Sequence, residues 1–405
     1  MKLLLISQYY APEPFRIHEI CEALAARGHQ ITVLTGIPNY PMGRVYPGYR
    51  HRKHRKEEIR GVQLMRVWTV PRKSGNFFRM LNYFSYPFSA GIRALGLDSS
   101  YDAVMVYQLS PVIMAWPGIL YSCKNRTPLL LYCLDLWPAS LVAADIRQDS
   151  LIYRAFHKIS RNIYKKADRI LVASPGFTGY LRDEFHIAEQ RISVLPQHAE
   201  DMRDLAGDAE DPGKKQASER DETFQIVFAG NLGKAQNLDI VLDAAKLLPD
   251  VVFHIIGDGS ELQHLKAEAG KNIRFYGRLP EKDLPVYFAK ADALLVTLQA
   301  DPALSLTLPV KVQTYMSAGK PILGAANGEI SRVIREAQCG ICGNAEDAAD
   351  LAENIRKLME NEHRAEMGRN ARQYYETHYS KKQFLDVLEQ ELEEIAGIHR
   401  SHTGQ

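Results

Sequence analysis

Short apolar runs alternate with amphipathic segments along most of the chain. The first run, Lys2–Ile6, predicts a buried strand. Apolar residues then recur at the spacing of one helix face, at Ile17, Ile20, Cys21 and Leu24. Gly28 provides the stop of that helix. Because the same unit repeats, the pattern predicts parallel sheets with helices on both faces, a doubly wound α/β fold.

The strand candidates fall into two groups. In the first half they are Ile31–Thr35, Leu64–Trp68, Ala103–Tyr107, Leu129–Cys133, Arg169–Val172 and Ile192–Val194. In the second half they are Gln225–Ala229, Val251–Ile256, Ile273–Tyr276, Ala293–Thr297 and Ile322–Leu323. Between them, around residues 200–222, the apolar pattern gives way to Asp, Gly and Lys, which is typical of a linker.

We therefore expect four parts: an N-terminal domain over residues 1–200, a linker over 201–222, a C-terminal domain over 223–375, and a last helix over 376–405. The apolar stripe of this helix predicts that it packs back toward the first domain. Two facing domains of this kind would place the carboxyl ends of both sheets along one cleft, so that each domain holds one substrate.

Composition excludes several other classes of protein. With 46% hydrophobic and 24% charged residues among 405, the chain is globular, and its net charge of +2 says little about its partners. The basic run Arg50–Lys56 is short and accompanied by no nucleic-acid reading module. Cys339 and Cys342 form one C-x-x-C without the second pair of a structural zinc site, so we expect reduced thiols.

Neither a leader nor a membrane span is predicted. The apolar start is too short for a signal peptide, which favours a cytoplasmic location. Prolines and glycine interrupt the stretch Ala103–Cys123, which indicates a strand followed by a helix rather than a transmembrane segment.

The loop after the first strand, Gln8–Arg16, lies where doubly wound folds bind ligands. It lacks the Gly-x-Gly-x-x-Gly pattern, which argues against a nicotinamide or flavin enzyme. Its two prolines stiffen a loop that we expect to present Glu13 and Arg16 to the cleft. The alternative is a capping loop with a solvated ion pair.

Asp135 follows a fully apolar strand and precedes Trp137 and Pro138. An acid at such a place is costly unless it caps the next turn or faces a polar ligand. Both interpretations stay open: Asp135 caps the following segment, or it holds a sugar or acceptor hydroxyl.

In the second half, Gly230, Asn231 and Lys234 lie in a strand-to-helix turn that could approach a phosphate, although such turns also carry Gly and Asn for conformational reasons alone. Arg278, which follows another strand, could reach the same phosphate.

A short helix between Pro309 and Gly319 is the most informative segment. Its first turn carries Lys311, and Thr314 follows on the same side. Free N–H groups, the helix dipole and the lysine together predict an anion site suited to a diphosphate. A plain buried connector is the alternative, but it leaves a lysine at the unfavourable end of the dipole.

Four segments together resemble one family. They are Glu13–Ile17, Leu34–Pro41, Asp135–Pro138 and Lys311–Pro321. In combination they resemble a family-4 retaining glycosyltransferase of the GT-B architecture, with two Rossmann-like domains, in the subfamily of capsule, colanic-acid and O-antigen enzymes that includes fucosaminyltransferases. The resemblance implies a UDP-sugar bound by the C-terminal domain, an acceptor bound by the N-terminal domain, and transfer with retention of configuration.

The resemblance and the residue arguments together give three sets of site residues. The expected catalytic residues are Asp135, Lys234 and Lys311. The expected donor-binding residues are Gly230, Asn231, Arg278, Thr307, Leu308, Gln313, Thr314 and Glu329. The expected acceptor-binding residues are Glu13, Arg16 and Trp137.

One departure from the family concerns the ribose. The family carries two glutamates near the short helix, and the corresponding positions here hold Leu306 and Thr314. Thr314, Gln313 and Glu329 are the alternative ribose ligands. No Asp-x-Asp metal pair accompanies them, so we expect no metal requirement.

Such relatives act on a polyprenyl-diphosphate saccharide, which implies peripheral contact with the inner face of the plasma membrane. Arg44–Lys56 and the aromatic, basic segment Arg72–Phe84 suit that contact, and a solvated loop with an ordinary core helix is the alternative. The sugar is a hexose or an N-acetylhexosamine, an N-acetylated deoxy-hexosamine being the type that the subfamily suggests. A non-catalytic nucleotide-sugar-binding subunit and a UDP-sugar epimerase on the same fold are the competing functions. Donor sugar, acceptor, linkage and oligomeric state stay open.

Overall fold

The computed structural model describes residues 1–50, 53–73, 75–142, 146–206 and 223–403. The chain forms two compact units. The first combines residues 1–195 with residues 385–405, and the second consists of residues 196–384. The first unit is therefore assembled from two separate stretches of sequence.

The first unit contains, in its described residues, an eight-stranded sheet in the order β3-β4-β2-β1-β5-β6-β7-β8. The strands are β1 (Lys2–Ile6), β2 (Gln30–Gly36), β3 (Lys56–Ile59), β4 (Val62–Val67), β5 (Ala103–Gln108), β6 (Leu129–Cys133), β7 (Arg169–Val172) and β8 (Ile192–Val194). All neighbours pair in parallel except β3, which is antiparallel to β4. The central strands β1, β5 and β6 are buried on both faces, which explains their continuous apolar sequences.

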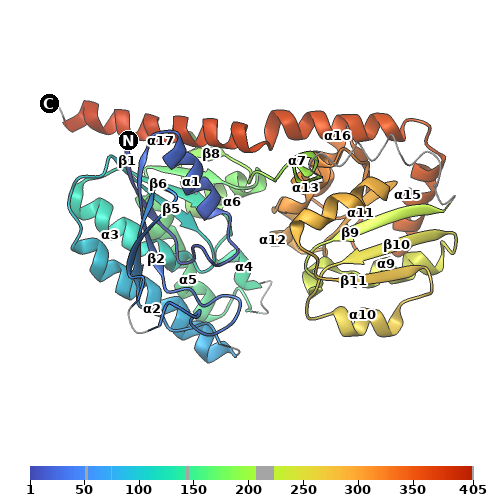
Figure 1. The fold of residues 1–405 in the computed structure, drawn as a ribbon, viewed down its shortest axis with the longest axis horizontal. Helices are drawn as coiled ribbons and strands as arrows, with labels where there is room; N and C mark the ends of the chain where they lie inside the picture. The colour runs from blue at the N-terminus through green and yellow to red at the C-terminus, as the bar shows by residue number, and fades with distance from the viewer. Residues whose placement is uncertain (51–52, 74, 143–145, 207–222, 404–405) are drawn as a thin grey trace. The chain divides into compact units, whose positions relative to one another are not determined.

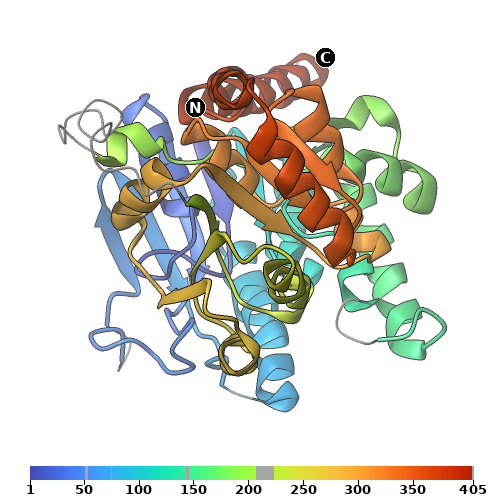
Figure 2. The same cartoon turned by 90° about the vertical axis from the view of Figure 1, so that its right-hand side faces the viewer.

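Helices cover both faces of this sheet (Figures 1 and 2). They are α1 (Ile17–Ala26), α2 (Asn76–Leu95), η1 (Val112–Ala115), α3 (Trp116–Asn125), α4 (Ala139–Val142), α5 (Leu151–Lys166), α6 (Gly176–Phe185) and η2 (Glu189–Arg191). The helix α17 (Lys381–Thr403) contributes its residues from Leu385 onward to the first unit. There Leu388 and Leu392 are buried, and Glu389 bonds to both Arg27 (2.8 Å) and His29 (2.5 Å).

The second unit contains, in its described part, a six-stranded parallel sheet in the order β11-β10-β9-β12-β13-β14. The strands are β9 (Phe224–Ala229), β10 (Val251–Ile256), β11 (Ile273–Gly277), β12 (Ala293–Thr297), β13 (Ile322–Ala325) and β14 (Gly340–Gly343). The helices are α7 (Met202–Ala206), η4 (Lys234–Gln236), α9 (Asp239–Lys246), α10 (Leu262–Glu268), η5 (Glu281–Asp283), α11 (Leu284–Lys290), α12 (Pro302–Ser305), α13 (Val310–Ser317), α14 (Glu329–Glu336), α15 (Ala348–Glu360) and α16 (Arg364–His378).

Each strand order reverses at one place, between β1 and β5 in the first sheet and between β9 and β12 in the second. At such a reversal the loops that leave the carboxyl ends of the two strands run to opposite faces of the sheet, which opens a ligand-binding position between them. In each unit this reversal locates the place to look for a substrate.

The fold class predicted from the sequence is confirmed, including the return of the last helix to the first domain. Residues 103–123 form a strand and two short helices, and no helix in the described residues combines the length and apolarity needed to cross a bilayer.

The domain limits differ from the expected ones. Of the expected linker, residues 202–206 form α7, whose Met202 is buried in the core of the second unit, and residues 207–222 lie outside the described residues. His51 and Arg52 of the basic run also lie outside them. Residues 376–384 belong to the second unit, so the chain returns to the first unit only at Leu385.

Candidate active site

In the second unit, Lys311 lies at the reversal between β9 and β12. Pro309 is the N-cap of α13, so Lys311 falls in its first turn, as the sequence predicted. The ammonium reaches over to the loop that follows β9: its Nζ lies 4.1 Å from the Phe228 ring centroid and donates a hydrogen bond to Oε1 of Gln236. The two loops of the reversal are therefore joined by one lysine.

The environment of Lys311 disfavours its positive charge. Burial lowers the pKa of the lysine from 10.5 to about 7. A Cβ at position 230 would lie only 2.8 Å from Nζ, so a larger residue there would displace the ammonium. A desolvated ammonium beside the first turn of a helix gains strongly from an anion, which supports the prediction of a diphosphate position.

The hydroxyl of Tyr315 fixes α13 to β9. It accepts a hydrogen bond from the backbone N–H of Ala229 (2.8 Å) and donates one to the carbonyl of the same residue (3.1 Å). Since Ala229 directly precedes Gly230, these two hydrogen bonds fix the position of α13 relative to the turn that carries Gly230.

The loops that follow β9 and β10 contact each other backbone to backbone. The N–H of Gly230 donates to the carbonyl of Ile256 and the N–H of Leu232 to that of Asp258, both at 2.9 Å. A Cβ at Gly257 would lie 1.8 Å from the Gly230 carbonyl oxygen. Glycine is thus required for the two turns to approach this closely.

The remaining donor-binding predictions have mixed outcomes. Asn231, Lys234 and Arg278 are exposed and stay candidates, whereas Leu308 is buried and can offer only its backbone. Thr307 is partly exposed, and its hydroxyl donates to the carbonyl of Ala303 (3.3 Å).

Of the three proposed ribose ligands, the structure contradicts Gln313. Its side chain is fully buried, and its amide donates to the carbonyls of Val310 (3.0 Å) and Pro309 (2.7 Å). It therefore stabilises the start of α13 and cannot reach a nucleotide. The Thr314 hydroxyl donates a hydrogen bond to the carbonyl of Val310 (3.1 Å). Glu329, at the start of α14, forms an ion pair with Arg332 (2.8 Å).

In the first unit, Asp135 follows β6 and accepts hydrogen bonds from the indole N–H of Trp137 (3.0 Å) and from the hydroxyl of Ser110. Burial raises the pKa of this carboxyl group, and the bonds to its side chain lower it in part. Trp137 is buried, with its ring 5.1 Å from that of Phe156. It therefore positions Asp135, and its contact with the acceptor stays a prediction.

Glu13 is also placed differently from the prediction. Its side chain is buried, and one carboxylate oxygen accepts hydrogen bonds from the backbone N–H groups of Asn39 and Tyr40, both at 2.7 Å. The other accepts the N–H of Tyr10 (3.3 Å). Glu13 thus ties the loop after β1 to the loop after β2, and it is not presented outward. Arg16, partly exposed, is the N-cap residue of α1.

Sequence reasoning missed three residues that build these sites: Gln236, Tyr315 and Ser110. Gln236 lies two residues after Lys234, but nothing in its spacing indicates a partner 75 positions away. Tyr315 lies on the buried face of α13, and in the sequence such a residue cannot be distinguished from an ordinary core residue. Ser110 could have been found, because it follows β5 as Asp135 follows β6, and both strands were expected in the same sheet.

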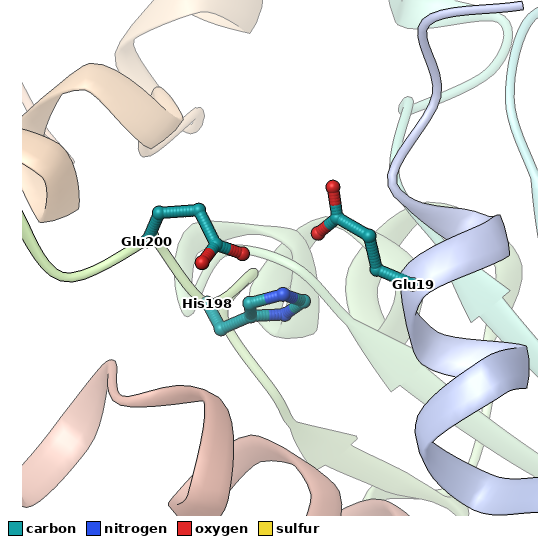
Figure 3. Close-up of side chains that lie close together, drawn as sticks. All are labelled: Glu19, His198 and Glu200. Carbon is teal, nitrogen blue, oxygen red and sulfur yellow. The ribbon is translucent and has the colours of Figure 1, made fainter. Parts of the chain in front are cut away.

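Figure 3 shows the side chains of Glu19, which belongs to α1, and of His198 and Glu200, which alternate on the segment after β8. Within the second unit, the ring of His198 packs at 4.9 Å on Phe384, and Glu200 lies 3.8 Å from Nζ of Lys381. These two side chains thus fasten that segment to the beginning of α17.

Two family models match the chain, one over each half. The model described as "Glycosyl transferase 4-like domain" matches residues 15–198, and "Glycosyl transferases group 1" matches residues 210–374.

The chain is 28% identical over 267 residues to "Probable glycosyltransferase WbjE" of Pseudomonas aeruginosa, a match that covers 62% of this chain and 64% of that protein. It is 23% identical to "Putative colanic acid biosynthesis glycosyl transferase WcaI" of Escherichia coli K12, over 98% of this chain and all of that protein.

Among solved structures, Alr3699/HepE of Anabaena, crystallised with UDP, superposes with a TM-score of 0.71 at 14% identity, over 97% of this chain and all of the other. This likeness concerns the fold. The family resemblance inferred from the four sequence segments is confirmed by the two models and the two relatives: the chain belongs to the family-4 glycosyltransferases of the GT-B architecture.

Proposed function

We propose that this glycosyltransferase moves a sugar, with retention of configuration, from a UDP-sugar to a lipid-linked saccharide during the synthesis of a cell-surface polysaccharide. The name of WcaI, a putative colanic acid biosynthesis glycosyl transferase, supports the pathway class, and the complex of HepE with UDP supports the nucleotide. The sugar is of the hexosyl or N-acetylhexosaminyl type.

The observation that carries the proposal is the placement of the Lys311 ammonium in the first turn of α13, over the Phe228 ring at the reversal of the second sheet. Its bond to Gln236 keeps it beside the first turn of α13, where backbone N–H groups and the helix dipole favour negative charge. An arriving diphosphate supplies that charge and restores the protonated form of the lysine.

Transfer with retention proceeds in this proposal by front-face displacement. The bond between the sugar C1 and the diphosphate oxygen breaks, the bond from C1 to the acceptor oxygen forms on the same face, and the acceptor hydroxyl proton passes to the departing phosphate. Lys311, the exposed Lys234 and the start of α13 stabilise the charge that develops on that phosphate. Arg278 and Glu329 complete the donor set, toward the phosphate and the ribose.

On the acceptor side, Asp135 is the residue whose carboxylate is both preorganised and costly to bury. Trp137 and Ser110 fix its orientation, and a hydroxyl of the acceptor would be its polar ligand. Arg16 is the candidate cation for a diphosphate-linked acceptor, which would bring the enzyme to the inner face of the membrane.

The proposal is tested with purified full-length protein. A thermal-shift screen of UDP-, GDP- and dTDP-sugars should show stabilisation by UDP-sugars, since a ligand that binds only the folded state raises its melting temperature. Release of UDP with a detergent-solubilised lipid-linked saccharide then tests transfer. No shift with any UDP-sugar would reject the donor assignment.

The same assay separates the competing functions. A binding subunit would show the thermal shift without turnover, and an epimerase would convert the donor without acceptor. The Asp135→Asn variant keeps two acceptor lone pairs for Trp137 and Ser110 but loses the negative charge that orients the acceptor hydroxyl. We therefore expect a folded protein whose transfer rate falls at least roughly a hundredfold while UDP-sugar binding persists.

A further inference from the structure

The helix α2 has an unusual distribution of side chains. Its outward row consists of large apolar residues spaced three and four apart, each between 39% and 69% exposed: Phe77, Leu81, Phe84, Phe88, Ile92 and Leu95. Its inward row holds one large side chain, that of Tyr86, and is otherwise small or polar, with Asn82, Ser85, Ala90 and Ala94 buried. A helix that packs on a core normally shows the reverse pattern, so the outward row of α2 is built to meet a partner.

The apolar surface continues onto α3, which packs beside α2 (Figure 1). Trp116 and Leu120 are one helical turn apart and 43% and 40% exposed. The two helices approach closely at Gly91, where an added Cβ would lie 3.0 Å from Cδ1 of Leu120. The exposed rows of α2 and α3 therefore form one continuous patch, which we call the apolar face.

A basic cavity of about 330 Å³ adjoins this face, because Ser89 and Arg93 of α2 line it. Its other lining residues include Arg55, Lys56, Arg66 and Trp68. The lining contains four cations and no acid. Along α2 itself the sequence also has no acid, with Arg79 and Arg93 as its charges.

Among the cations that line the cavity, Lys56 is exposed and Arg93 is partly exposed. Arg66 is buried beneath the lining, where its Nε donates to Glu57 (2.8 Å) and its Nη2 to the carbonyl of Ala11 (2.7 Å), so it contributes no exposed donor to the cavity. Nη2 of Arg93 contacts the sulfur of Met65 (3.6 Å), which is a poor acceptor. An anion with several oxygens fits this set better than a neutral group.

We infer that the apolar face of α2 and α3 docks on an anionic phospholipid bilayer, with lipid phosphates in the basic cavity and the aromatic side chains in the acyl boundary. An apolar helix row flanked by cations and free of acids is complementary to such an interface, which presents phosphates just above apolar chains. The inference rests on the proposed lipid-borne acceptor and names the surface that brings the enzyme to it.

The test is sedimentation of the full-length protein with vesicles of phosphatidylcholine alone or mixed with phosphatidylglycerol, without any polyprenyl lipid. The wild type should partition onto the mixed vesicles and less onto the neutral ones, with binding weakened by salt. Phe84→Ser/Phe88→Ser/Ile92→Ser should reduce partitioning at least roughly tenfold, since these exposed side chains provide the inserted area.

Two further variants separate the parts of the surface. Lys56→Gln/Arg93→Gln should lose the preference for phosphatidylglycerol and keep weak binding to neutral vesicles. The matched control is Leu247→Ser/Val286→Ser, which removes exposed apolar side chains of the second unit and should partition like the wild type. Equal partitioning of the triple variant and this control would overturn the inference.

A second copy of the chain is the other conceivable occupant of the apolar face. Analytical ultracentrifugation without lipid decides this: a dimer that the triple variant abolishes would overturn docking on a bilayer.

UDP release with detergent-solubilised acceptor should be unchanged in the triple variant. If the wild type fails to bind vesicles while this activity persists, the docking surface is wrong and the proposed function stands. If it binds vesicles through the apolar face but gives no UDP-sugar response, the docking surface stands and the proposed function is wrong.

Discussion

At the scale of single residues, the charge state of Lys311 has a direct consequence for donor binding. With a pKa of about 7, the free enzyme holds the charged ammonium below that pH and the neutral amine above it. The diphosphate of a UDP-sugar binds the charged form. We expect affinity to be constant below about pH 7 and to fall by up to about tenfold per pH unit above it, measured by calorimetry.

The Lys311→Met variant should bind UDP-sugar more weakly and with no pH dependence in that range. Lys271→Met, which alters an exposed lysine of the same unit, should keep the wild-type profile. A wild-type affinity that rises with pH would contradict the role of Lys311.

Glu13 gives a second prediction, for stability. Burial raises its pKa from 4.5 to about 7, in spite of three backbone N–H donors that favour the charged form. Because the folded protein holds the proton more tightly than the unfolded chain, this group's stabilising contribution is complete below about pH 4.5 and is lost as the pH rises through about 7. Glu13→Gln should remove that slope from the urea-unfolding profile of the first unit.

Glu13→Ala should destabilise the same unit by about 3 kcal/mol, since three backbone N–H groups lose their acceptor. All three tryptophans of the chain, Trp68, Trp116 and Trp137, lie in the first unit, so tryptophan fluorescence reports its unfolding separately. A cost near zero would mean that water or another acceptor replaces the carboxylate.

At the scale of elements, the contact between the loops after β9 and β10 depends on glycine. Gly257→Ala introduces a Cβ that would meet the Gly230 carbonyl at 1.8 Å, at a φ of +147°. We expect a loss of more than about 2 kcal/mol and of UDP-sugar affinity, because the turn carrying Gly230 is displaced. Gly179→Ala, in α6 with nothing within 4 Å of the new methyl group, should instead stabilise by about 0.5 to 1 kcal/mol.

The sequence predicted most strands because a strand buried on both faces must be apolar throughout: Lys2–Ile6, Leu129–Cys133 and Val251–Ile256 agree to the residue. It missed β3, an edge strand with three charged residues out of four, and β14, whose Gly340–Gly343 sequence has little apolar character. Edge strands are partly covered, so the apolar pattern that reveals central strands is weak in them.

The candidate site was predictable to the level of its segments but less so for individual side chains. The position of Lys311 followed from Pro309 and the helix pattern alone. The inward turn of Gln313 and the burial of Trp137 depend on which way a side chain points and on partners far away in sequence, such as Ser110 for Asp135. Periodicity carries no information about either.

At the scale of the whole molecule, the proposed mechanism neutralises diphosphate charge by lysines and a helix start, without a divalent cation. Omitting Mg²⁺ or adding EDTA should therefore change the rate of UDP release less than about twofold. Excess Mg²⁺ added back after chelation is the control. Loss of most activity on chelation, restored by Mg²⁺, would show that a cation shares the task assigned to Lys311.

The first unit draws its last helix from residues 385–405, beyond the entire second unit. During synthesis, the surface that receives Leu388 and Leu392 is made long before those two leucines leave the ribosome. The apolar surface of the amino-terminal half therefore stays partly uncovered while some 190 further residues are translated. Docking of α17 is thus a late event in folding. A chain released early would leave the apolar surface beside Arg27 and His29 exposed to chaperones and proteases.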